Sequence, residues 1–243
     1  MGTVQSAPWW WAAAGLAAIG AVHSVTPLSP AAFAAGLAYL LASSVLLSLG
    51  LRRGEAARFG PANAVTATRS VLVAIVTAMV VSSFSTPVQA PILVSTVAVA
   101  LALDAVDGYV ARRTATVTEL GARFDMEVDA FLLLVLCAYD LRYVGVWVLA
   151  IGLMRYAFVG AAWLLPWMGA SLPPRYWRKV VTAICGIALT MVATGSLPGW
   201  LDSALAGIAL VLLIESFGRD VVWLVRARQR VAVEEPARVR PHS

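Results

Sequence analysis

Long runs of apolar residues, separated by short polar stretches, follow one another along almost the whole chain. A helix needs about 20 mostly apolar residues to cross a bilayer, and proline and glycine stand at the joints between the runs. The pattern predicts an all-α integral membrane protein with about eight transmembrane helices. Their expected spans are residues 8–26, 30–51, 63–84, 88–109, 120–139, 143–166, 178–196 and 200–218.

The arginines and the single lysine are concentrated in the polar stretches after the second, fourth and sixth runs and in the C-terminal tail. The opposite side holds only Arg142. Because cytoplasmic loops carry an excess of Lys and Arg, both termini and the basic loops are expected in the cytoplasm, in the cytoplasmic membrane of a bacterium. Residues 52–60 are expected to form a short interfacial helix, 219–231 a basic amphipathic segment and 232–243 a disordered tail.

Composition excludes a soluble enzyme with one anchor, since 60% of the residues are hydrophobic and only 13% are charged. The net charge of +5 does not indicate nucleic acid as a partner, because the cations lie in short patches between apolar runs and form no continuous basic face. Cys137 and Cys185 lie inside apolar runs and are interpreted as small hydrophobic residues.

Four aspartates stand where the membrane should disfavour them. Asp104 and Asp107 close the fourth run, and Asp125 and Asp129 open the fifth. Spacings of three and four residues put each pair on one helix face, and a hairpin would bring the faces together. Each charge near a helix centre costs about 2.5–3.5 kcal/mol, so the set requires a counter-cation or a wet cavity. Carboxylates alone suit Mg²⁺ or Mn²⁺.

The neighbouring residues suit a phosphate ligand. Gly108 and Gly121 remove side chains where a ligand or a second backbone could approach, and Arg112 offers a planar fork for phosphate. These residues predict a metal-dependent enzyme that acts on a phosphorylated lipid at the cytoplasmic edge of the membrane.

The stretch from Asp104 to Asp129 also resembles a known signature. Its fixed residues are Asp104, Asp107, Gly108, Ala111, Arg112, Gly121, Asp125 and Asp129, and all eight match the motif of the CDP-alcohol phosphotransferases. The resemblance implies a six-helix core over residues 61–218. Residues 1–60 would then be an accessory two-helix hairpin with its interfacial segment, and 219–243 a basic cytoplasmic tail.

The resemblance implies that the hydroxyl of an alcohol attacks the β-phosphorus of CDP-diacylglycerol and releases CMP. It assigns two divalent ions to the four aspartates and makes Asp129 the base that takes the proton of the alcohol. The CDP pocket would be lined by Asp107, Gly108, Ala111, Arg112, Gly121 and Asp125. A homodimer is a further expectation from the family.

A second, shorter segment resembles the opening of the first core helix in this family. Asn63, Thr66 and Arg69 fit its Asn-x-x-Thr-x-x-Arg spacing, which would place them near the nucleotide. Taken singly, Asn63 could equally be a helix N-cap and Arg69 an interfacial arginine.

Acceptor choice should depend on cations of the other core helices. Arg155 lies inside the sixth run, where topology does not explain a charge, and Glu215 is a candidate partner for it. The remaining candidates are Arg123, which could instead pair with Glu127, and a positive cluster that the positive-inside rule could also explain: Arg175, Arg178 and Lys179. Together they favour a phosphorylated acceptor such as glycerol 3-phosphate or inositol phosphate.

Three other functions compete with this interpretation. The same chemistry could use serine, glycerol or phosphatidylglycerol as the acceptor. The intramembrane acids could instead form the cation pathway of an ion or proton transporter, although their closeness to the basic loop disfavours it. A degenerate scaffold would bind neither metal nor CDP-lipid.

Overall fold

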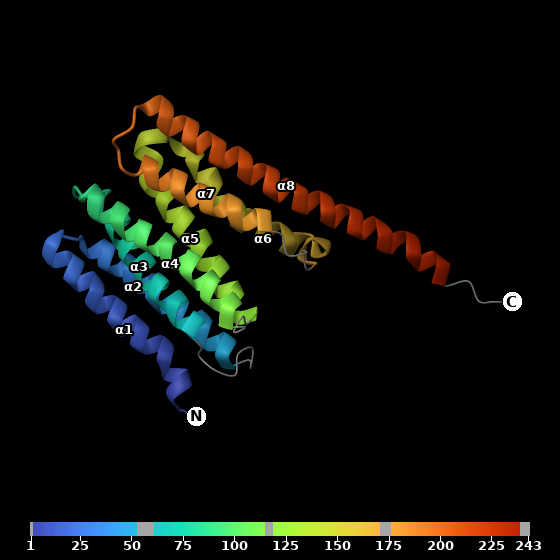
Figure 1. Ribbon diagram of the computed structural model, residues 1–243, viewed down its shortest axis with the longest axis horizontal. Helices are drawn as coiled ribbons and strands as arrows, with labels where there is room; N and C mark the ends of the chain where they lie inside the picture. Colours follow the sequence, from blue (N-terminus) through green and yellow to red (C-terminus); the bar gives the residue numbers. More distant parts are fainter. Residues whose placement is uncertain (1, 53–60, 115–118, 171–175, 239–243) are drawn as a thin grey trace.

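The computed structural model describes residues 2–52, 61–114, 119–170 and 176–238, and in this part of the chain every regular element is a helix (Figure 1). The predicted all-α class is therefore confirmed. The elements are α1 Gly2–Val25, α2 Pro30–Arg52, α3 Pro61–Ser82, α4 Ala90–Thr114, α5 Glu119–Val144, η1 Val146–Val148, α6 Leu149–Leu164, η2 Pro166–Gly169, α7 Tyr176–Val192 and α8 Gly199–Arg238.

Three helical stretches of the described chain are long and apolar enough to cross a membrane: Pro30–Leu49, Val65–Ser82 and Val146–Leu164. Ala90–Val106 is apolar but shorter. These helices indicate a multi-pass membrane protein. The eight predicted α-helices are confirmed as helices, and a membrane crossing by all eight stays a prediction.

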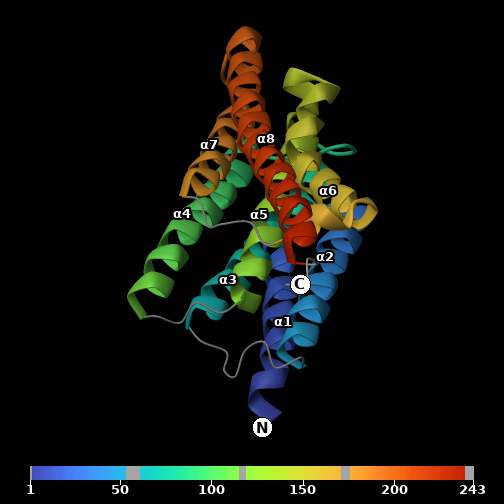
Figure 2. The same cartoon turned by 90° about the vertical axis from the view of Figure 1, so that its right-hand side faces the viewer.

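The helices alternate in direction, which gathers the chemistry at one end. Figures 1 and 2 place the start of α1, the end of α2, the start of α3, the end of α4 and the start of α5 at the same end of the bundle. We call this end the site end. The predicted interfacial helix falls mainly on residues 53–60, which lie outside the described residues.

Helix α3 forms the centre of the packing, in contact with α1, α2, α4 and α5. Its residues from Val73 to Val80 are all buried, because neighbours cover every side of the helix. Small residues allow close approach. A Cβ added at Gly36 would lie 2.8 Å from Ile19 Cδ1, and one at Gly152 would lie 2.5 Å from the Cα of Leu134. These close contacts hold α2 against α1 and α6 against α5, and close packing of this kind leaves little freedom for the helices to shift.

The first two helices form a hairpin that covers one flank of α3 (Figure 2). The turn between them is fixed locally. His23 Nδ1 accepts a hydrogen bond from the Leu28 backbone N–H at 3.0 Å, and Ser29 Oγ caps α2 by accepting from Ala32 N–H at 3.2 Å. Pro30 at the first position of α2 has no N–H to leave unsatisfied.

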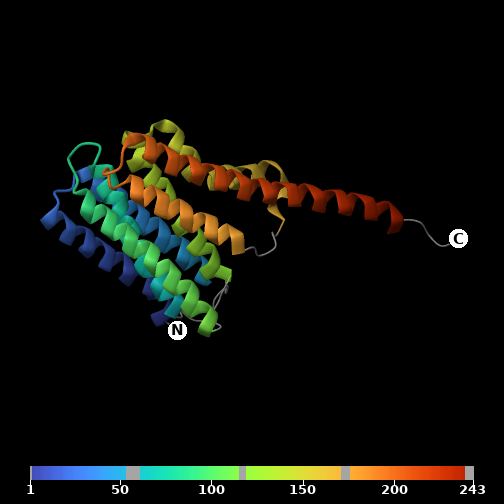
Figure 3. The ribbon, with the colours of Figure 1, turned by 45° about the horizontal axis from the view of Figure 1, so that its top comes forward.

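The C-terminal helix differs from the prediction. Helix α8 has 40 residues and continues to Arg238, extending well beyond the bundle (Figure 3). The prediction of a disordered tail over residues 232–243 is therefore wrong for residues 232–238. A helix that is already nucleated is extended by Ala, Glu and Arg at little cost, and α8 continues through Pro236 to its end at Arg238.

Candidate active site

Three of the predicted aspartates meet at the interface between two helices. Asp104 comes from α4, and Asp125 and Asp129 come from successive turns of α5. One carboxylate oxygen from each lies within 4.8 Å of the others, and all three residues are half-buried. The prediction that the two helix faces come together is confirmed for these residues.

Arg69 on α3 lies in the middle of this carboxylate cluster. Its side chain is fully buried, and Nε donates to the Ala100 carbonyl at 3.3 Å. One terminal nitrogen pairs with Asp104 at 2.9 Å and also with Asp125, while the other donates to Asp129. The sequence placed Arg69 near the nucleotide and did not predict its ion pairs with the carboxylates.

The charges of this group do not balance. One guanidinium faces the three carboxylates of Asp104, Asp125 and Asp129, which leaves two negative charges in a half-buried cluster. Excess negative charge there is costly, and a divalent cation would remove it. Hard cations prefer carboxylate oxygens, so the donor atoms that are present fit Mg²⁺ or Mn²⁺.

The remaining residues of the signature belong to the same helices, α4 and α5. Asp107, Gly108, Ala111 and Arg112 belong to the last turns of α4, and Asn63 belongs to the first turn of α3, but their side chains lie outside the described residues. Their assigned roles stay predictions. Gly121 is in the first turn of α5, and Thr66 is buried one turn before Arg69.

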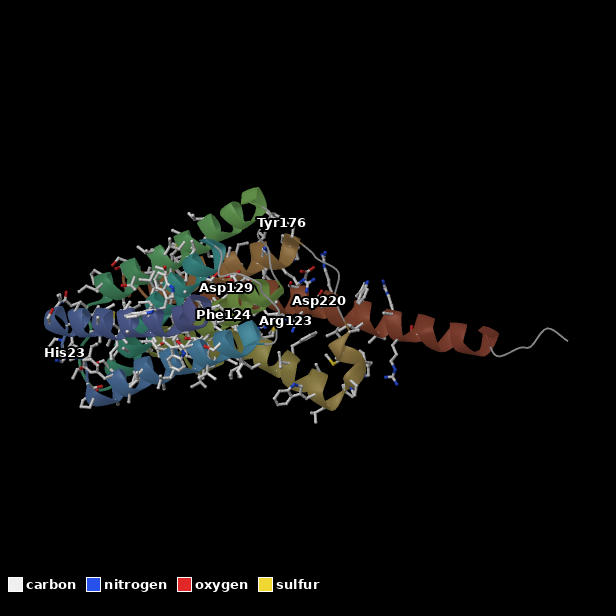
Figure 4. All side chains as sticks on the ribbon, turned by 90° about the horizontal axis from the view of Figure 1, so that it is seen from below. His23, Arg123, Phe124, Asp129, Tyr176 and Asp220 are labelled. Carbon is white, nitrogen blue, oxygen red and sulfur yellow. The ribbon has the colours of Figure 1, made fainter. Side chains whose placement is uncertain are left out.

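Figure 4 shows where this site lies in the bundle. Asp129 is in the interior, toward the end where Arg123, Tyr176 and Asp220 lie, and His23 is at the opposite end. The carboxylate cluster therefore lies away from the end at which Arg142 closes α5.

Arg155 pairs with Glu127 of α5, two residues from both Asp125 and Asp129. The expectation that Arg155 pairs with Glu215 is therefore wrong. Glu215 pairs with Arg219 one turn later and accepts a hydrogen bond from Trp177 Nε1 at 2.9 Å. The sequence could not distinguish the two acids, because both are compatible with a nearby arginine and only the packing of α6 on α5 decides between them.

The other candidate cations lie nearer the helix ends. Arg178 at the start of α7 is 3.6 Å from the buried Asp220 of α8, Lys179 is exposed and Arg123 is exposed on α5. Arg175 lies outside the described residues. The ion pair of Arg178 joins α7 to α8 and adds a structural explanation to the topological one.

The helical bundle and its carboxylate cluster define a membrane protein with a candidate metal site. The model of the CDP-alcohol phosphatidyltransferase family matches residues 59–215, more than half of the chain, and the chain belongs to this family. No curated protein and no solved structure matches it. The protein is therefore an enzyme of a family that transfers a phosphatidyl group from CDP-diacylglycerol to an alcohol, and the resemblance found from the motif is confirmed.

Replacing Arg69 tests the charge balance of the cluster. The Arg69→Gln variant should lose about 3 kcal/mol of stability in EDTA, because it leaves buried carboxylates without their partner. Added Mg²⁺ should raise its melting temperature in detergent more than it raises that of the unaltered protein, because binding to the folded state stabilises it.

Arg226→Gln, at an exposed position on α8, is the control and should melt like the unaltered protein in both buffers. Equal melting temperatures for Arg69→Gln and the unaltered protein in EDTA would show that Arg69 does not stabilise the cluster.

Proposed function

We propose that this enzyme transfers the phosphatidyl group of CDP-diacylglycerol to a small phosphorylated alcohol, such as glycerol 3-phosphate or inositol phosphate. The observation that carries the proposal is the meeting of Asp104, Asp125 and Asp129 around Arg69 within the matched region of the family. Arg155 on α6 pairs with Glu127 of α5, which lies between Asp125 and Asp129 in the sequence.

The reaction assigns distinct tasks to these residues. Asp129 accepts the hydroxyl proton of the alcohol, the resulting oxygen bonds to the β-phosphorus, and the bond from that phosphorus to CMP breaks. Asp104, Asp107, Asp125 and Asp129 would hold two divalent ions, Mg²⁺ or Mn²⁺, which would neutralise the diphosphate and the leaving CMP. Holding the base in a low-dielectric site with its hydrogen bonds already formed is a large part of such catalysis.

The nucleotide would lie where the beginning of α3, the end of α4 and the beginning of α5 come together. Asn63, Thr66 and Arg69 on α3, with the glycines and Arg112 of the signature, form the proposed CDP pocket. Glycine at 108 and 121 leaves room for the diphosphate, and the fork of Arg112 suits its oxygens.

Arg155 is the proposed ligand of the phosphate of the acceptor, because it is a partly buried cation that topology does not explain. Its pairing with Glu127 holds it in place until a stronger anion arrives. Arg123, Arg175, Arg178 and Lys179 would add positive potential around the acceptor. Serine, glycerol and phosphatidylglycerol remain the alternative acceptors, and none of them carries the phosphate monoester that Arg155 is proposed to bind.

The proposed organisation places a six-helix core over residues 61–218, after an accessory hairpin in 1–60 and before a cytoplasmic tail in 219–243. Eight crossings would leave both termini and the site facing the cytoplasm of a bacterial cell. A transporter is disfavoured by the family and by Arg69, whose guanidinium lies among the carboxylates that a moving cation would need.

Release of CMP by the purified protein tests the reaction. With Mg²⁺ and CDP-diacylglycerol, CMP should form fastest with a phosphorylated alcohol when glycerol 3-phosphate, inositol phosphate, serine, glycerol and phosphatidylglycerol are compared. Asp129→Asn should lower kcat by about 100-fold or more, since loss of a general base has that order of effect. Full turnover by Asp129→Asn, or ion flux in proteoliposomes without CMP release, would contradict the proposal.

Arg155 provides a separate test of the acceptor. Arg155→Gln should raise the KM for a phosphorylated alcohol about tenfold or more, because a hydrogen bond to a charged group contributes about 1.5–3 kcal/mol. Glu127→Gln should lower that KM or leave it unchanged, since it frees the guanidinium. Arg219→Gln, which removes an exposed pair on α8, is the control. Unchanged acceptor KM in Arg155→Gln excludes Arg155 as the phosphate ligand.

A further inference from the structure

The hairpin α1–α2 precedes the matched region of the family, yet it reaches the neighbourhood of the site. Helix α2 packs along α3 and also contacts α5, the two helices that carry Arg69, Asp125 and Asp129. Tyr39, near the middle of α2, lies at this junction.

The ring of Tyr39 is fixed by a stacking contact with α5. It lies nearly parallel to the ring of Phe131, with centroids 4.6 Å apart and planes 18° apart. Phe131 comes two residues after Asp129 on the same helix. An offset stack of this kind restricts the ring, so the direction of the phenol group is set by the hairpin and α5 together.

The hydroxyl of Tyr39 is buried, and the polar group beside it is the hydroxyl of Ser70. Neither it nor the buried hydroxyl of Ser70, which lies beside it, makes a well-aligned hydrogen bond within the described residues. An unsatisfied buried hydroxyl costs about 1–3 kcal/mol, and phenylalanine would fill the same stack without that cost. The charges of Arg69 and Asp129 both act on this phenol.

A small cavity lies between the α1–α2 hairpin and the core, next to Ser70. It is lined by side chains of α1, α2, α3 and α5, including Trp11, Leu40, Ser43, Ser44, Ser70 and Phe124, and its water-sized space measures about 20 Å³. This is room for a single water molecule, beside three serines in an otherwise apolar lining. Ser70, the residue after Arg69, thus lies beside Tyr39 and also lines this cavity.

We propose that Tyr39 is a positioning residue of the active site, supplied by the hairpin that lies outside the family core. Its hydroxyl and that of Ser70 support the pair of Arg69 and Asp129 from the side of α3 that faces α2. The phenol acts as a hydrogen-bond donor toward the hydroxyl of Ser70. The inference rests on the proposed function in one respect, the role of Asp129 as the base.

Substituting Tyr39 by Phe tests this role because it keeps the stack on Phe131 and removes only the hydroxyl. The Tyr39→Phe variant should lower kcat for CMP release about tenfold with an unchanged KM for CDP-diacylglycerol, an effect typical of groups that orient metal ligands. Ser70→Ala should lower kcat similarly, and the double variant should be no slower than the worse single one, because both hydroxyls support the same pair. Tyr139→Phe, a buried tyrosine near the opposite end of α5, is the matched control.

Mn²⁺ affinity, measured by electron paramagnetic resonance, gives a readout that does not depend on turnover. It should fall several-fold in Tyr39→Phe and Ser70→Ala and stay unchanged in Tyr139→Phe. If the unaltered protein releases no CMP, the proposed function fails, and the Mn²⁺ comparison still tests Tyr39. A kcat and a Mn²⁺ affinity within twofold of the unaltered protein in both Tyr39→Phe and Ser70→Ala would overturn the proposal.

Discussion

The ion pairs of Arg69 with three aspartates are the interaction on which the rest of the site depends. Asp104, Asp125 and Asp129 would repel one another at their observed separation in a weakly solvated interior, and the guanidinium between them offsets part of that repulsion. Because the four side chains come from α3, α4 and α5, the same contacts fix how these helices pack. The packing of these helices and the charge of the candidate metal site therefore both depend on the ion pairs of Arg69.

The remaining negative charge connects the fold to the reaction. A cluster that Arg69 only partly neutralises attracts a divalent cation, and a diphosphate brings further charge that such a cation can balance. Glu127 plays a related part for Arg155 on the other face of α5. Arg69 and Arg155 thus each have carboxylate partners, which an anionic substrate or a bound metal can replace.

The sequence predicted the elements better than it predicted their partners. Apolar run length located the eight helices, and the aspartate spacing predicted the shared faces of α4 and α5, because both signals are local. Arg69 was missed as the counter-ion since it lies 56 residues before Asp125, and no local pattern records a contact across that distance. The same limit applies to the pairing of Arg155 with Glu127, and to Tyr39, whose proximity to the site depends on how the hairpin packs.

Mn²⁺ binding to the purified protein in detergent, followed by electron paramagnetic resonance, tests most directly whether the carboxylate cluster is a metal site. We predict saturable binding that Mg²⁺ displaces, that is lost in Asp104→Asn and Asp125→Asn, and that persists in Asp202→Asn, a buried aspartate in the first turn of α8. Binding of Mn²⁺ that is equally strong in all three variants, or no binding to the unaltered protein, would contradict a metal site at the cluster.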